Sequence, residues 1–268
     1  MITSTSNQQM KTIVQLNKKG KARRELRAFV VEGIKMLRET PRALLRQVYV
    51  SEKFLADEKN RVCLAEFGID YETVSDRVFA HISDTNTPQG ILAVVRQPSY
   101  CFEDLLEGTH PRLLVLEDIQ DPGNLGTMFR TGEGAGLSGI IMSRDTVDLF
   151  APKTVRATMG SIYRVPYYVS EDLRATLHAL QDAGVHIYAA HLRGEKFYDE
   201  PDYTGATAFL IGNEGNGLTQ ETADLADTYI RIPMEGRLES LNAAMAAGIL
   251  MYEAHRQQGG NQCVSGLR

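Results

Sequence analysis

The sequence predicts an α/β protein whose larger, C-terminal part is built on a parallel β-sheet. From residue 112 onward, short apolar runs alternate with longer amphipathic segments, which is the pattern of strands connected by helices. The runs are apolar throughout, as in strands whose two faces are both covered. They lie at 113–116, 139–142, 185–190, 208–211 and 229–232. Because such sheets bind ligands at the carboxyl ends of their strands, these ends are the first place to search for a site.

Two helices of the C-terminal part have recognisable ends. A helix over 171–183 is predicted to begin after Ser170, a hydroxyl residue suited to an N-cap, and to end at Gly184. The final helix is predicted over 240–255. Its apolar residues follow the i, i+3, i+4 spacing of one buried face, and they are Leu241, Ala244, Met245, Gly248, Ile249 and Tyr252.

The N-terminal part predicts a smaller α/β unit that opens with a basic helix. Its further elements are an apolar run at 29–31, a helical segment at 34–46, strand-like runs at 48–50 and 91–95, and a turn at 87–90. Pro98, Gly108 and Pro111 then lie in a stretch without periodicity. We therefore predict an N-terminal domain at 1–97, a linker at 98–111, a C-terminal domain at 112–258 and a flexible tail at 259–268.

The composition is that of a soluble globular chain, with 268 residues, 43% of them hydrophobic and 24% charged. Its apolar runs are far shorter than the roughly 18 residues of a membrane helix, so no membrane partner is expected. Three scattered cysteines without a C-x-x-C pair argue against a disulfide framework or a zinc ribbon and fit a reducing compartment. These features favour a cytoplasmic location, although the basic, Ser- and Thr-bearing N-terminus also has the composition of a transit peptide.

The net charge of −5 hides an asymmetry along the chain. Residues 1–50 hold 11 lysines and arginines against three acidic residues, a net charge of +8, whereas the rest holds 18 against 31, a net charge of −13. The positive density is highest at Lys18, Lys19, Lys21, Arg23, Arg24 and Arg27. Such a cluster could bind the phosphates of a nucleic acid, or it could simply be a solvated helix face.

Three predicted strands end in loops rich in glycine, amide and carboxylate residues. We call 117–126 the first loop, 211–218 the second loop and 232–242 the third loop. Glycines at such turns let backbone amides approach a ligand closely, as nucleotide sites require. Any one of these loops alone could equally be no more than a tight turn.

Several common sites are excluded by missing motifs. The glycines at 132–136 have the spacing G-x-G-x-G, which is not the dinucleotide fingerprint, and they do not directly follow a strand. The chain has no G-x-x-x-x-G-K-[ST] phosphate loop, no H-E-x-x-H metal motif and no G-x-S-x-G nucleophile elbow. We therefore expect no metal and no covalent nucleophile.

Taken in order, the three loops form a specific pattern. Together with residues 127–131, which follow the first loop, they contain D-P-x-N-x-G-x-x-x-R-T, then I-G-N-E-G-x-G-L, then I-P-M-x-G-x-x-E-S-L-N. This set resembles the three motifs of the SpoU (TrmH-like) family of RNA ribose 2′-O-methyltransferases, in the SPOUT superfamily, and the segment 156–166 resembles the stretch that links those motifs. The N-terminal part is similar to the ribosomal-protein L30-like RNA-binding domain of many members, which weakens the transit-peptide interpretation.

The resemblance implies a fold and a cofactor. The family's C-terminal domain is a parallel-sheet SPOUT domain tied in a deep trefoil knot, a rare exception to unknotted topology. It binds S-adenosylmethionine in that knot, largely through backbone groups of the second and third loops. Here the implied cofactor-binding residues are Gly212, Asn213, Gly215, Ile232, Met234 and Leu241, although Ile232 and Leu241 could equally be core residues.

The resemblance also implies a catalytic set. Arg130 matches the arginine that the family places near the ribose and its phosphate. Apart from this resemblance, it could be an arginine that forms an ion pair on the helix surface. Asn124 matches a residue that positions Arg130 and substrate, or it caps the following helix. Glu214 is expected to pair with an arginine of the substrate or of a second subunit. Ser240 and Asn242 match the family's S-x-N pair, and Ser240 could simply be the N-cap of the last helix.

The implied partners are a second copy of the chain, because members of the family act as homodimers, and structured RNA. The L30-like domain favours ribosomal RNA, of the 23S type, over transfer RNA. A transfer-RNA 2′-O-methyltransferase and a non-catalytic RNA-binding SPOUT protein are the alternatives. A nucleotide-dependent dehydrogenase is a more distant one, because the glycine fingerprint is missing.

Overall fold

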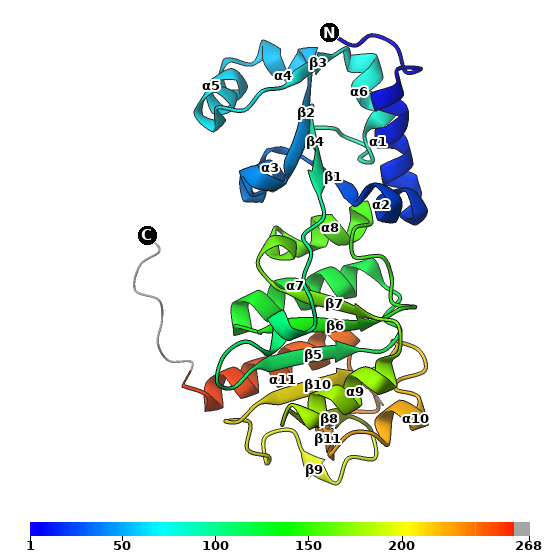
Figure 1. Ribbon diagram of the computed structural model, residues 1–268, viewed down its shortest axis with the longest axis vertical. Helices are drawn as coiled ribbons and strands as arrows, with labels where there is room; N and C mark the ends of the chain where they lie inside the picture. The colour runs from blue at the N-terminus through cyan, green and yellow to red at the C-terminus, as the bar shows by residue number, and fades with distance from the viewer. Residues whose placement is uncertain (239, 260–268) are drawn as a thin grey trace. The chain divides into compact units, whose positions relative to one another are not determined.

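The computed structural model describes residues 1–238 and 240–259, and the chain divides into two compact units. The first unit comprises Met1–Ser99 together with Asp148–Tyr163, and the second comprises Tyr100–Val147 together with the chain from Arg164 onward. Figure 1 labels the helices and strands of both. Within the described residues, none of the helices has the length and apolar character that a membrane crossing requires.

The first unit is a mixed four-stranded sheet covered by helices. The strands are β1 (Ala28–Glu32), β2 (Leu45–Ser51), β3 (Glu72–Val74) and β4 (Ile91–Arg96), in the order β1-β4-β2-β3, with only β2 and β3 parallel. The helices are α1 (Gln8–Lys18), α2 (Gly20–Leu26), α3 (Ile34–Glu39), η1 (Arg42–Leu44), α4 (Glu52–Ala56), α5 (Glu58–Phe67) and α6 (Asp76–Ile82). Residues of α1 and α6 form the core on one sheet face.

The predicted helix over 34–46 is too long. α3 ends at Glu39, and β2 already begins at Leu45. Pro41 explains the early end, because the residue before a proline is disfavoured in helical conformation, and Thr40 has the extended ψ of 120°. Strands β2 and β4 confirm the strand-like runs predicted at 48–50 and 91–95, and the apolar run at 29–31 lies in β1.

A segment distant in sequence completes the first unit. Helix α8 (Pro152–Thr158) and the 3₁₀ turn η3 (Ser161–Tyr163) lie between two strands of the second unit, yet they pack on the first. The Phe150 ring lies 4.9 Å from the Phe29 ring, and the Tyr163 hydroxyl is hydrogen-bonded to the Thr40 hydroxyl at 2.9 Å. The predicted boundaries at 97 and 112 remain predictions, and the structure adds 148–163 to the N-terminal unit.

Arg23 is a structural residue of this unit, which corrects its predicted role as an RNA ligand. Its side chain is only 6% exposed and reaches the Asp148 carboxylate through Nε at 2.9 Å and Nη2 at 2.7 Å. Its Nη1 donates to the carbonyl oxygens of Leu16 and Asn17 at the end of α1. Counting charges along the sequence missed this because a buried pair forms with a residue 125 positions away.

Replacing Arg23 with methionine should therefore destabilise the protein rather than its RNA complex. The variant removes the buried guanidinium from the partly buried Asp148 carboxylate and from two carbonyl oxygens of α1, and we expect a loss on the order of 3 kcal/mol of unfolding free energy. Arg24 is exposed, so Arg24→Met is the matched control and should change the unfolding free energy by less than about 0.5 kcal/mol. Denaturant unfolding of both variants measures the difference; equal midpoints would contradict the assignment.

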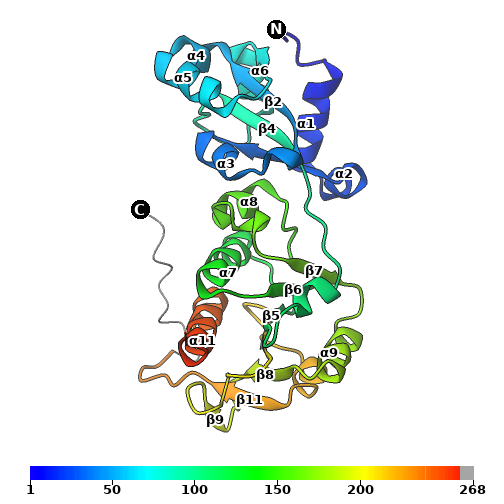
Figure 2. The ribbon, with the colours of Figure 1, turned by 60° about the vertical axis from the view of Figure 1, so that its left-hand side comes forward.

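The second unit is a seven-stranded parallel sheet. The strands are β5 (Arg112–Leu116), β6 (Gly139–Ser143), β7 (Tyr167–Ser170), β8 (His186–Ala190), β9 (Lys196–Phe197), β10 (Thr207–Ile211) and β11 (Thr228–Arg231), in the order β7-β6-β5-β10-β8-β11-β9. On one face lie α7 (Pro122–Ala135) and α11 (Ala243–Gln257), and on the other lies α9 (Leu173–Asp182) (Figure 2). The remaining elements are η2 (Glu103–Leu106) and α10 (Gln220–Ala223).

This arrangement confirms the α/β class and all five predicted C-terminal strands. The edge strands β7 and β9 were not predicted, because they are short and partly exposed and so lack a continuous apolar run. Strands β5 and β10 are neighbours, with Leu116 opposite Ile211. The first and second loops therefore leave the sheet side by side. Strand order does not test the implied trefoil knot, which stays a prediction.

Three expectations about helix ends and faces are wrong. Helix α9 is capped by Asp172, whereas Ser170 ends β7 with its buried hydroxyl bonded to Thr176. Helix α11 is capped by Asn242, not by Ser240. Its buried face consists of Ala243, Ala244, Ala247, Leu250, Met251 and Ala254, whereas Met245 and Tyr252 are 60% and 50% exposed. Small alanines fill the core here, so the larger side chains of the predicted stripe were misleading. The predicted tail lies, apart from residue 259, outside the described residues.

Candidate active site

A strained turn directs the first loop toward the second. Asp118, just after β5, has a φ of 54°, in the left-handed region that residues with side chains rarely adopt. Ser143 stabilises this turn: its hydroxyl accepts from the Asp118 N–H at 2.8 Å and donates to the Asp118 carboxylate at 2.6 Å. The Asp118 carbonyl in turn accepts from the Asn213 side chain at 2.8 Å. The two loops are thus joined through backbone as well as side-chain groups.

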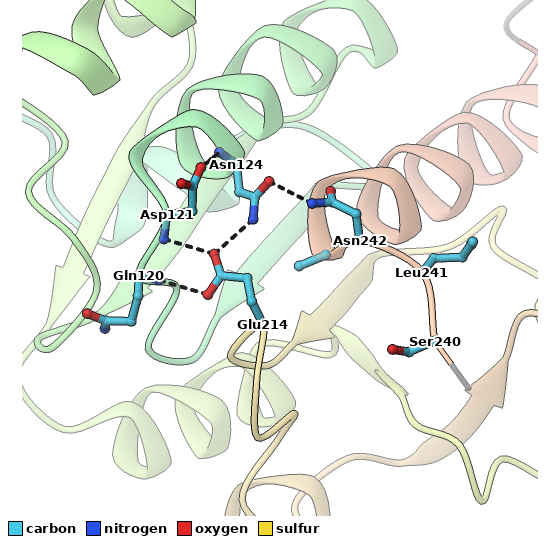
Figure 3. A pocket seen from close by; sticks show the side chains of 8 residues that line it. Gln120, Asp121, Asn124, Glu214, Ser240, Leu241 and Asn242 are labelled. Atoms are coloured by element: carbon cyan, nitrogen blue, oxygen red, sulfur yellow. Dashed lines mark hydrogen bonds between the residues drawn. The ribbon is translucent and has the colours of Figure 1, made fainter. Parts of the chain in front are cut away.

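Glu214 is the centre of the site (Figure 3). One carboxylate oxygen accepts from the Gln120 N–H at 3.0 Å, and the other accepts from the Asp121 N–H at 2.9 Å and from the Asn124 side chain at 3.0 Å. Within its own chain Glu214 thus bonds to the first loop, and its pairing with an arginine of the substrate or of a second subunit stays a prediction. Its carboxylate organises the start of α7, where backbone N–H groups favour a negative charge.

These bonds set the charge state of Glu214. Partial burial would raise the pKa of its carboxyl, but the hydrogen bonds from the Gln120 amide, the Asn124 side chain and the Asp121 amide outweigh this and lower the pKa below its usual value. Glu214 is therefore an acceptor and not a proton donor near neutral pH. A carboxylate in this state can hold its three donors permanently in place.

Asn124 and Asn242 connect the third loop to the same network. The Asn242 side-chain amide donates to the Asn124 oxygen at 3.0 Å, while its own oxygen caps α11 by accepting from the Ala244 and Met245 amides. Asn124 does not cap α7, because Asp121 does so by accepting from the Asn124 N–H at 2.8 Å. The bonds Glu214–Asn124–Asn242 therefore link one residue from each loop.

A pocket of about 820 Å³ opens over this network. Four of the five predicted catalytic residues line it, and its complete lining is Gln120, Asp121, Asn124, Glu214, Ser240, Leu241, Asn242 and Ala243. We call it the polar pocket. Arg130 lies further along α7, is exposed, and has no hydrogen bond or ion pair to any described residue. Gln120 and Asp121 were not predicted, although both lie in the first loop.

A second pocket, also of about 820 Å³, adjoins the polar pocket. All six predicted cofactor-binding residues line it, together with the ends of β8, β10 and β11. We call it the cofactor pocket. Sequence reasoning missed the wall formed by His191, Leu192, Arg193 and Phe197, which follows β8. The rule that ligands bind at strand ends could have found it, but this segment has none of the glycines that marked the other loops.

The lining of the cofactor pocket suits an adenine nucleoside. The second loop folds so tightly that a Cβ on Gly212 would lie 2.2 Å from the backbone of Gly217 and Leu218, which brings backbone groups to the pocket wall. Reciprocal backbone bonds join Asn213 and Gly217 at 3.1 and 2.9 Å. Apolar walls come from Ile211, Ile230, Ile232 and Leu241. Flat apolar walls with a few fixed polar groups are typical of such sites.

The two pockets share part of their lining, namely Glu214, Ser240, Leu241 and Ala243. A ligand in the cofactor pocket and one in the polar pocket would therefore meet at this shared wall. No group of three or more His, Cys, Asp or Glu residues in the described part of the chain is arranged to hold a metal ion. The shared lining can bring two ligands together, with polar side chains fixed around their meeting point.

Comparison with known proteins identifies the family. The model of the SpoU rRNA Methylase family matches residues 111–252, which is more than half of the chain. The chain belongs to the SpoU rRNA methylase family. A second model, the MRM3-like substrate binding domain, matches residues 7–93. Together the two matches account for both units and confirm the predicted family and its fold class.

Individual relatives match this chain over two thirds of its length to nearly all of it. The chain is 35% identical over 251 residues to the 23S rRNA (guanosine(2553)-2′-O)-methyltransferase RlmP of Bacillus subtilis, covering 94% of this chain and 97% of that protein. It is 33% identical over 181 residues to RlmB of Ralstonia nicotianae, a 23S rRNA (guanosine-2′-O-)-methyltransferase, covering 66% and 73%. An rRNA methyltransferase structure from Sinorhizobium meliloti with bound AdoMet is 34% identical, with a TM-score of 0.80 over 95% of this chain and 97% of that one. S-adenosylmethionine as the cofactor is thereby confirmed for the family.

Proposed function

We propose that this protein transfers a methyl group from S-adenosylmethionine to a ribose 2′-hydroxyl of 23S-type ribosomal RNA, at a guanosine. The observation that carries the proposal is the shared wall between a cofactor pocket and a polar pocket, closed by bonds among all three loops. The RlmP and RlmB relatives, named for guanosine 2′-O-methylation of 23S rRNA, support the choice of substrate. Ribosomal RNA as substrate also supports a cytoplasmic location.

The residues divide the work between binding and orientation. S-adenosylmethionine supplies an electrophilic methyl group, held by Gly212, Asn213, Gly215, Ile232, Met234 and Leu241. Asn124, Asn242 and Ser240 offer amide and hydroxyl groups to the ribose, and Glu214 fixes the first of these. Holding the hydroxyl in line with the methyl group raises the rate, because orientation replaces a bimolecular encounter.

Arg130 completes the site from outside the polar pocket. Its exposed guanidinium can bind the phosphate next to the target ribose with two parallel hydrogen bonds. A guanidinium has only donors, so the role of Arg130 is to orient the phosphate and the hydroxyl and to stabilise the negative charge that develops on the hydroxyl oxygen. The hydroxyl proton is released to water, and S-adenosylmethionine leaves as S-adenosylhomocysteine.

The basic surface of α1 and α2 is proposed to hold the RNA. Lys18, Lys19, Lys21, Arg24 and Arg27 are exposed, unlike Arg23. Neutralising Lys18 and Lys19 with alanine should weaken RNA binding and lower the slope of log K against log salt by about 1.5, because each lost phosphate contact removes about 0.7–0.9. Lys53 and Lys59 are exposed lysines of the same unit, so their double alanine variant is the control. An equal slope of log K against log salt for both variants would contradict a role of the basic surface in RNA binding.

The exposed side of α11 is proposed to form a homodimer. Met245 and Tyr252 have large, mainly apolar side chains that are exposed, whereas the alanines of the same helix are buried against the sheet. Introducing aspartate at both positions should convert the dimer to a monomer in sedimentation, because two charges would be buried in the interface. Val62→Asp, at an exposed residue of α5, is the control. A wild-type monomer would end the dimer proposal.

Binding of the cofactor tests the proposal most simply. Calorimetric titration should detect S-adenosylmethionine and not NAD. Binding of NAD alone would overturn the proposed reaction, and transfer RNA in place of ribosomal RNA in the methylation assay tests the alternative substrate.

A further inference from the structure

A carboxylate outside both pockets is buried beside the second loop. Glu117 follows β5 and is 7% exposed. One oxygen of its carboxylate accepts from the Thr219 N–H at 2.8 Å, and the other accepts from the Thr219 hydroxyl at 2.8 Å and from the Thr222 hydroxyl. A carboxylate that takes three donors in a buried place is costly to disturb, since each lost bond leaves a polar group without a partner.

The donors of Glu117 mark the point where the second loop ends. That loop begins at Ile211 in β10 and finishes before Thr219, the N-cap of α10, which is a helix of only four residues. So short a helix has little stability of its own. The loop is bonded to the first loop through Asn213 and Glu214 near its start. Among the described contacts, the bonds from Thr219 to Glu117 hold the end of the second loop in the same way.

We infer that Glu117 is a positioning residue for the cofactor pocket: it holds the end of the second loop at Thr219 and thereby keeps Gly215, Gly217 and Leu218 in the pocket wall. This inference rests on the proposed function, because it assigns the pocket to S-adenosylmethionine. Glu117 itself touches neither pocket. Its loss should therefore weaken cofactor binding without slowing the reaction once the cofactor is bound.

Two variants separate the carboxylate from its hydroxyl partner. Glu117→Gln keeps the side-chain size but places an amide donor against one of the existing donors, and we expect the Kd and KM for S-adenosylmethionine to rise about tenfold. Thr222→Val removes only one donor and should raise both constants about threefold. The value of kcat at saturating S-adenosylmethionine, and the KM for RNA, should stay within about twofold of wild type.

Thr176→Val is the matched control. Thr176 is also a buried threonine of the second unit, bonded to the Ser170 hydroxyl at 2.7 Å, but it lies at the start of α9 and lines neither pocket. It should cost similar stability and leave the KM for S-adenosylmethionine unchanged. If Glu117→Gln does not fold, Thr222→Val decides.

The outcomes are distinct. A higher KM for S-adenosylmethionine in the Glu117 and Thr222 variants, with none in Thr176→Val, supports the inference. Unchanged KM values in folded Glu117→Gln or Thr222→Val, or an equal rise in Thr176→Val, overturn it. If wild type binds no S-adenosylmethionine, the proposed function has failed instead, and with it the pocket assignment.

Discussion

Replacing Arg130 with alanine is expected to lower kcat for RNA methylation about a thousandfold, a loss typical of removing a group that stabilises developing charge. The Kd for S-adenosylmethionine should stay within about twofold, because Arg130 does not line the cofactor pocket. Folding should be unaffected as well, since its exposed side chain bonds to no described residue. Single-turnover methylation and calorimetric titration measure the two quantities.

Arg130→Lys is the companion variant. It retains the charge but not the planar pair of donors, so its rate should lie between those of wild type and Arg130→Ala. A kcat for Arg130→Ala within about threefold of wild type would remove Arg130 from the catalytic set. A lost cofactor affinity would show instead that the arginine acts through the fold.

Replacing Glu214 with glutamine is expected to lower kcat about a hundredfold. Glutamine has one acceptor oxygen where Glu214 serves three donors, so the Gln120 and Asp121 amides and the Asn124 side chain cannot all be satisfied. Asn124 would then lose its orientation toward Asn242. The rate should fall because even a small displacement of a group at a reacting centre is costly. Methylation rates at saturating cofactor and RNA measure the effect, and Glu221→Gln, an exposed carboxylate of α10, is the control.

The same variant has a signature in pH. The pKa of Glu214 is lowered in the folded protein, so its ionised form stabilises the fold at any pH above the unfolded pKa, and this contribution is lost as the pH falls through the folded pKa. The stability difference between wild type and Glu214→Gln should therefore be largest near neutral pH and shrink in acid. A difference that grows in acid would contradict the lowered pKa.

The three loops were predictable because their residue types and order are specific. Glycine, asparagine and carboxylate residues at strand ends carry the family resemblance, and all six cofactor-binding residues that this resemblance implies line one pocket. The role of Glu214 was not predictable, because two of its three partners are backbone amides of residues more than 90 positions away. A sequence pattern shows which side chains are present, but not which backbone amides the fold brings next to them.

Other errors arose where two structures fit one pattern. Helix α11 carries apolar residues on two sides, and only packing decides that its alanines face the sheet while Met245 and Tyr252 do not. Arg23 looks like its exposed neighbours until Asp148 is brought beside it. In both cases the sequence pattern fits a buried and an exposed side chain equally well, and only a contact between residues distant in sequence decides between them.

Methylation of ribosomal RNA tests the central claim most directly. Ribosomal RNA from cells without the gene is incubated with the protein and S-adenosylmethionine carrying a labelled methyl group, and 2′-O-methyl positions are then mapped. We expect label at a guanosine ribose of the 23S RNA with wild type and none with Arg130→Ala. Absence of label with wild type, or label on a base instead of a ribose, would contradict it.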